Sequence, residues 1–164
     1  MIWRVPLADL DYGEEENRAV LEVLNRRWLT MGEVTKQFED EFAAAHGVKY
    51  ALAVSNATVA LHMACLALGI GPGDEVLVPA HTYMATATAV LAVGAIPVIV
   101  DIDESLTISP SAIRDAIGPH TRAIIPVHMW GAACDMNAIM AIAEERGLLV
   151  LEDVCQGIGG SYEG

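Results

Sequence analysis

Apolar residues along most of this chain fall either into short unbroken runs or into helical spacing, and the two patterns alternate. Runs typical of buried strands occupy five segments, residues 50–54, 75–78, 96–100, 123–127 and 148–151. Helical patterns separate them at residues 57–68, 83–93, 109–117 and 135–146. The alternation predicts an α/β fold, with a mostly parallel sheet and helices on both of its faces.

Turn residues mark the ends of these predicted helices. Gly69, Gly94 and Gly147 each follow one. Glycine readily adopts the left-handed conformation that ends a helix. Ser109 and Pro110 open another helix, because proline suits a first helical turn.

The first part of the chain has no strand pattern. Two helices are predicted there, at residues 13–27 and 34–46, with a connector at residues 28–32. We therefore divide the chain into an N-terminal helical segment, residues 1–47, and a larger α/β part, residues 48–164.

Composition decides between a globular and a membrane protein. The chain is 54% hydrophobic, which excludes a disordered chain. Residues 50–73 and 76–100 carry no charged side chain, and each is long enough to raise a membrane-spanning interpretation. Polar residues, glycines and prolines interrupt both stretches, so we interpret them as strand–helix units and expect no membrane span.

Charge and cysteine usage further narrow the classes of protein to which this chain could belong. Nine Lys and Arg against 22 Asp and Glu give a net charge of −13, which argues against nucleic-acid binding. Residues 1–6 lack the apolar core of a signal peptide. Cys65, Cys134 and Cys155 show no paired spacing, so we expect a cytoplasmic protein with three reduced, buried thiols and no metal site.

Ligands of open parallel sheets bind beyond the carboxyl ends of the strands. Residues 55–58, Ser-Asn-Ala-Thr, stand there at a predicted helix start. They fit either an anion site made of free N–H groups or ordinary N-capping. Tyr83 begins another helix at this edge, where its ring could stack on a flat cofactor or pack into the core.

Three more candidates follow the later strands. Asp153 ends a buried strand, and its carboxylate needs a partner: a cationic ring nitrogen of a ligand, a helix N-terminus or a nearby histidine. His128 fits a site residue or a satisfied core histidine equally well. Cys155 suggests a thiol nucleophile, but no paired histidine is apparent in the sequence.

Taken together, these segments resemble the DegT/DnrJ/EryC1/StrS family of sugar aminotransferases, which use pyridoxal 5'-phosphate (PLP) on a fold-type-I scaffold. The similarity runs in order along the chain through residues 28–32, 55–58, 60–61, 68–76, 79–86, 94–98, 101–103, 124–128, 135–136 and 152–153. No dinucleotide-binding or P-loop glycine motif competes with it.

The resemblance implies five cofactor contacts. Ala57 and Thr58 would hold the phosphate of PLP, and the ring of Tyr83 would stack on the pyridine ring. Asp153 would pair with the protonated ring nitrogen, which keeps the ring an electron sink. Gln156 would donate a hydrogen bond to the phenolic oxygen.

The resemblance also implies an activity. The family moves an amino group from glutamate or glutamine to a keto-sugar, often nucleotide-linked, and a keto-cyclitol is the nearest alternative acceptor. The site is completed in a homodimer, and residues 28–32 fall in a region that often helps to form it.

One departure concerns the Schiff-base lysine of the family, which lies in a segment farther along than this sequence reaches. Lys36 and Lys49 do not match that position. We therefore expect the 164 residues to be the N-terminal portion of a larger enzyme, with no catalytic residue of their own and no activity alone. The alternatives are a PLP-dependent sugar dehydratase, in which another residue replaces the lysine, and a non-catalytic binding or regulatory protein.

Overall fold

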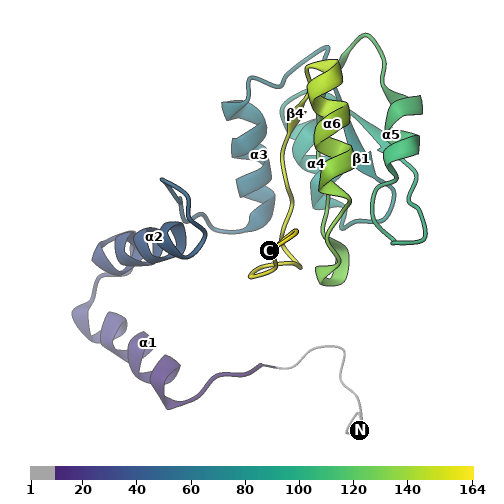
Figure 1. Ribbon diagram of the computed structural model, residues 1–164. Helices are drawn as coiled ribbons and strands as arrows, with labels where there is room; N and C mark the ends of the chain where they lie inside the picture. The colour runs from purple at the N-terminus through teal and green to yellow at the C-terminus, as the bar shows by residue number, and fades with distance from the viewer. Residues whose placement is uncertain (1–9) are drawn as a thin grey trace, which may run out of the picture. The chain divides into compact units, whose positions relative to one another are not determined.

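A parallel sheet forms the centre of the α/β part in the computed structural model, which describes residues 10–164 (Figure 1). Its four strands are β1 (Glu75–Pro79), β2 (Ile96–Val100), β3 (Thr121–Ile124) and β4 (Leu149–Val150), in the order β2-β1-β3-β4. Every pairing is parallel. The predicted fold class is confirmed.

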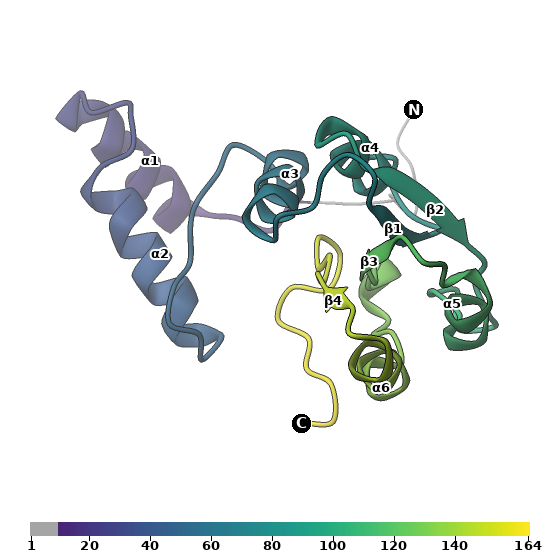
Figure 2. The ribbon, with the colours of Figure 1, turned by 90° about the horizontal axis from the view of Figure 1, so that it is seen from above.

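Helices cover both faces of this sheet (Figure 2). On one face lie α3 (Ala57–Ala67) and α4 (Ala85–Ala92), and on the other lie α5 (Pro110–Ala116) and α6 (Met136–Arg146). The alternation of side chains along β1 explains the two layers: Val76 and Val78 join one core cluster, whereas Leu77 joins the other. All three side chains are fully buried.

The strand predicted at residues 50–54 is wrong. No strand is assigned there, and its backbone joins no ladder within the described chain. The N–H of Ala53 donates instead to the Glu39 side chain, at 2.8 Å. An apolar run forms a strand only where a neighbouring strand forms hydrogen bonds with its N–H and C=O groups, and the run itself does not specify that partner.

Several boundaries also differ from those predicted. Helix α4 begins at Ala85, so Tyr83 precedes it and does not start it. A short 3-10 turn, η1 (Met129–Gly131), follows β3 and was not predicted. β3 and β4 are shorter than expected, but an isolated parallel bridge between Val127 and Asp153 continues their pairing.

The chain divides into two units, Met1–Ala53 and Val54–Gly164, and the boundary predicted at residue 47 stays a prediction. The first unit holds α1 (Glu14–Arg26) and α2 (Glu33–Ala45). Of its described residues only Ala43 is buried, because two short helices cannot enclose a core. The expectation about a signal peptide concerns residues 1–6, which lie outside the described part.

Within residues 10–164, no helix combines the length and the apolar character that crossing a bilayer requires.

Candidate functional site

Polar residues collect beyond the carboxyl ends of β1, β3 and β4. Figure 1 shows the chain running down from β4 to the edge at which α3 and α6 begin. Three segments meet there through hydrogen bonds: residues 81–86, 128–134 and 152–156. This is the sheet edge at which the sequence places its candidate residues.

The backbone of Asp153 is fixed between those segments. Its N–H donates to the carbonyl of Pro126 at 2.9 Å, and its own carbonyl accepts the N–H of His128 at 3.1 Å. Both bonds extend the β3–β4 ladder by one bridge. The strand pairing therefore sets the position of this carboxylate.

The Asp153 carboxylate is buried, with 6% of the residue exposed. Oδ2 accepts the Thr86 hydroxyl at 3.1 Å, and Oδ1 accepts the N–H of Cys155 at 3.2 Å. No ion pair of the described residues includes Asp153. A buried anion that has donors but no counter-charge is suited to a cationic ligand group.

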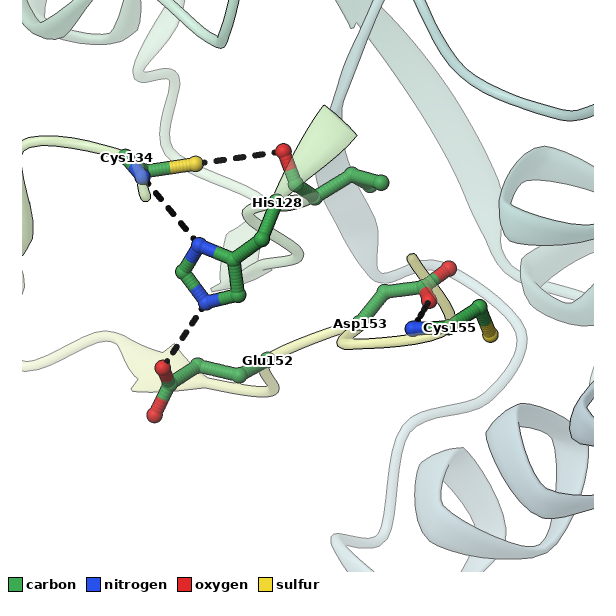
Figure 3. A network of polar contacts seen from close by, with 6 residues as sticks. His128, Cys134, Glu152, Asp153 and Cys155 are labelled. Carbon is green, nitrogen blue, oxygen red and sulfur yellow. Dashed lines mark hydrogen bonds and ion pairs between the residues drawn. The ribbon is translucent and has the colours of Figure 1, made fainter. Parts of the chain in front are cut away.

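His128 does not supply that counter-charge. Its Nδ1 accepts the N–H of Cys134 at 3.1 Å, so the proton of the neutral ring lies on Nε2, which donates to Glu152 at 3.0 Å (Figure 3). Both ring nitrogens are thus engaged by the protein. Of the two interpretations that the sequence left open for His128, the geometry favours a satisfied core histidine.

Cys155 is not a thiolate nucleophile in this arrangement. Although the residue as a whole is exposed, protein atoms around the thiol exclude part of the surrounding water. This partial desolvation raises the pKa of the thiol to about 11, and the adjacent Asp153 carboxylate adds to that rise. The thiol therefore stays protonated at neutral pH. All three cysteines are free; Cys65 and Cys134 are buried as expected, but Cys155 is exposed because it lies in the segment after β4.

Gln156 binds the backbone of the η1 turn. Its Oε1 accepts the N–H of Trp130 at 2.8 Å. This contact uses the amide oxygen and leaves the amide nitrogen, a donor, without a hydrogen-bond partner among the described residues. Trp130 has a φ of 52°, which is unusual for a residue with a side chain. Its ring packs edge-on against the His81 ring, and the two ring centres are 4.9 Å apart.

The first turn of α3 fits both interpretations that the sequence left open. Asn56 caps the helix, since its Oδ1 accepts the N–H of Val59 at 3.0 Å. The N–H groups of Ala57 and Thr58 have no partner among the described residues, and both residues are exposed. Capping and anion binding are therefore compatible at this turn.

Tyr83 is 71% exposed, so it is not packed in a core within the described structure. It lies next to Thr82, whose hydroxyl is 2.9 Å from that of Thr86. Sequence reasoning missed Thr86, because its partner Asp153 lies 67 positions along the chain.

The structure thus joins only part of the predicted set. Asp153 is linked to the segment of Tyr83 through Thr86, and Gln156 is linked to η1. No hydrogen bond of the described residues connects Ala57 or Thr58 with this network. Residues 10–164 contain no group of three or more His, Cys, Asp or Glu side chains that could hold a metal ion.

Comparison with known proteins identifies relatives that match nine tenths or more of this chain. The chain is 46% identical over 152 residues to the spore coat polysaccharide biosynthesis protein SpsC of Bacillus subtilis, covering 92% of this chain and 39% of SpsC. An aminotransferase from Psychrobacter cryohalolentis is 40% identical with a TM-score of 0.89, covering 94% of this chain and 40% of that one. NtdA from Bacillus subtilis, solved with bound cofactor PMP, is 41% identical with a TM-score of 0.85, covering 90% and 35%.

The chain therefore spans about two fifths of the length of the relatives it matches. The model of the DegT/DnrJ/EryC1/StrS aminotransferase family matches residues 10–164. This chain belongs to that family.

Proposed function

We propose that this chain is the N-terminal portion of a PLP-dependent aminotransferase that moves an amino group from glutamate or glutamine onto a keto-sugar, often nucleotide-linked, or a keto-cyclitol. One observation carries the proposal: the buried Asp153 carboxylate has two donors and no counter-charge among the described residues. The polysaccharide pathway in the name of SpsC supports a sugar acceptor.

The described residues fit PLP as the ligand. Asp153 would face the protonated ring nitrogen, the only cationic group of the cofactor. The two free N–H groups at the start of α3, those of Ala57 and Thr58, would hold the phosphate, which is favoured at a helix N-terminus. The exposed ring of Tyr83 would cover the pyridine ring, and the amide nitrogen of Gln156 would donate to the phenolic oxygen.

Bound PLP supplies an electron sink for the carbanion that forms when the amino donor loses its α-proton. The residues of this chain bind and orient that sink. Asp153 would keep the ring nitrogen protonated, because a buried carboxylate stabilises a cation beside it. Gln156 would hold the phenolic oxygen, so two contacts would set the orientation of the ring.

The lysine that bonds to the cofactor is not among these residues. Lys36 pairs with Asp40 on α2, and the ammonium of Lys49 lies 4.9 Å from the ring centre of Tyr50. We propose that the lysine lies in sequence beyond Gly164, because the matched relatives are more than twice as long. The 164 residues alone would then bind cofactor without transaminating.

The gene sequence past the codon for Gly164 tests this directly. A lysine at the family position supports transamination, and a histidine there supports the dehydratase. Any other residue at that position supports a binding or regulatory role.

The complete protein, loaded with PLP, provides the functional test. Incubation with glutamate should yield 2-oxoglutarate and convert PLP to its amino form, PMP, as shown by absorbance and mass spectrometry. Addition of a keto-sugar should then return PMP to PLP. No change with glutamate or glutamine would refute the proposal.

We further propose that the complete protein is a cytoplasmic homodimer. Light scattering after size exclusion should give twice the mass of one chain, and a monomer that retains activity would contradict this.

A further inference from the structure

The hydroxyl of Thr86 points away from its own helix. Threonine within a helix usually returns its hydroxyl to a carbonyl of the preceding turn, as Thr88 does by donating to Ala85 at 3.3 Å. Thr86 instead donates to Asp153, 67 positions along the chain, at 3.1 Å. Only 1% of Thr86 is exposed, so no water competes for this bond.

Thr82 completes a directed chain of hydroxyl groups. The two hydroxyl oxygens are 2.9 Å apart, and either could donate by distance alone. The single proton of Thr86 is already given to Asp153, so Thr82 must donate to Thr86. A hydroxyl that receives one hydrogen bond donates a stronger one, so the pair acts on Asp153 as a unit.

These bonds leave the carboxylate with one orientation. Thr86 holds Oδ2, and the N–H of Cys155 holds Oδ1 at 3.2 Å. Cys155 follows Asp153 on the same segment, whereas Thr86 comes from α4 and ties that segment to another part of the sheet edge. Without Thr86, the carboxylate would have only a local restraint.

We propose that the Thr82–Thr86 hydroxyl pair is a positioning device that aims the Asp153 carboxylate at the cationic ring nitrogen of the bound cofactor. The proposal rests on the proposed function, because it needs a ring nitrogen at Asp153. It assigns to Thr86 a role that a space-filling threonine would not have. If the aimed orientation becomes one of several, the association constant for the cofactor is multiplied by the fraction of time for which that orientation is populated.

The test compares two probes in the complete protein: PLP, and its 1-deaza analogue, in which a C–H group replaces the ring nitrogen. The ratio of their dissociation constants measures the ring-nitrogen contact and cancels contributions common to both. In the unaltered protein PLP should bind more tightly than 1-deaza-PLP. Thr86→Val, which keeps the shape but loses the hydroxyl, should reduce this preference about tenfold, equivalent to about 1.4 kcal/mol.

Matched variants separate positioning from structure. Thr86→Ser should restore the preference, and Thr82→Val should reduce it less than Thr86→Val does. Thr88→Val removes a hydroxyl from the same helix and should leave the preference unchanged. In an Asp153→Ala background, Thr86→Val should have no further effect on the ratio, which is the double-mutant signature of one contact.

The outcomes distinguish this inference from the function on which it rests. If the unaltered protein prefers PLP and Thr86→Val keeps that preference, the positioning role is overturned and the cofactor role of Asp153 stands. If the unaltered protein binds both probes equally, both proposals fail. If Thr86→Val does not fold, the Thr82→Val variant decides: a reduced preference supports the proposal and an unchanged one overturns it.

Discussion

The ends of β3 and β4 are neighbouring polar regions that the sequence could not tell apart. His128 follows β3 and Asp153 follows β4, both are buried, and a backbone hydrogen bond joins them. At His128 the protein satisfies both ring nitrogens from Cys134 and Glu152. At Asp153 it supplies two donors but leaves the charge unpaired. Burial is thus common to both, and what separates the structural residue from the candidate ligand-binding residue is whether the protein leaves a charge unpaired.

The most direct way to break this comparison is to remove the unpaired charge. Asp153→Ala should weaken PLP binding by more than 100-fold, since losing one partner of a buried ion pair costs about 3 kcal/mol or more. The apoprotein should unfold at an unchanged or higher temperature, because an uncompensated buried anion has been removed. PLP titration and thermal melts of the apoprotein measure the two effects. An unchanged affinity would exclude the ring-nitrogen role.

The thiol beside Asp153 reports on the same charge. With its pKa raised from 9.0 to about 11, Cys155 should react with iodoacetamide at pH 8 roughly 100-fold more slowly than an unperturbed cysteine. The rate should climb about tenfold per pH unit up to about pH 11, because only the thiolate reacts. Asp153→Asn removes the anion and should accelerate alkylation, as followed by peptide mass spectrometry. A rate that is already maximal at pH 8 would show that the pKa of the thiol is not raised.

The opposite result is expected at His128. His128→Ala leaves the buried N–H of Cys134 without an acceptor, which should cost about 2–3 kcal/mol of unfolding free energy. The preference for PLP over its deaza analogue should remain. His128→Asn can place an amide oxygen near the former Nδ1 and should recover part of the loss. Urea unfolding gives the stability; a lost cofactor preference in a folded His128→Ala protein would erase the distinction between the two regions.

The smallest effect is expected at Glu152. Its side chain is 52% exposed, so water competes for its hydrogen bond with the His128 ring. Glu152→Gln keeps an oxygen that accepts from Nε2 and should change the unfolding free energy by less than about 0.5 kcal/mol. A loss comparable to that of His128→Ala would mean that His128 carries a charge in the folded protein.

Local patterns in the sequence predicted much of the fold. The run around Leu77 predicted a strand buried on both faces, and Gly69, Gly94 and Gly147 marked helix ends, where their φ values are 72°, 79° and 64°. These features depend only on neighbouring residues. The strand prediction at residues 50–54 was wrong because a strand also depends on a partner elsewhere in the chain.

The candidate site divides in the same way. Asp153 was recognisable because an acid ends an apolar strand, and the start of α3 because capping residues precede it. Thr86 and the Trp130–Gln156 contact were not recognisable, since each joins segments far apart in sequence. The roles of Ala57, Thr58, Tyr83, Asp153 and Gln156 toward PLP stay predictions.

The bridge between Val127 and Asp153 has a consequence for dynamics. The amide proton of Asp153 is held by Pro126 and shares its ladder with β3 and β4, so it can exchange with solvent only when the sheet edge opens. Its deuterium uptake should therefore track the opening of the sheet rather than the motion of a loop. The fold has therefore already ordered the backbone that carries this carboxylate. Asp153 should lose little conformational entropy when a ligand binds.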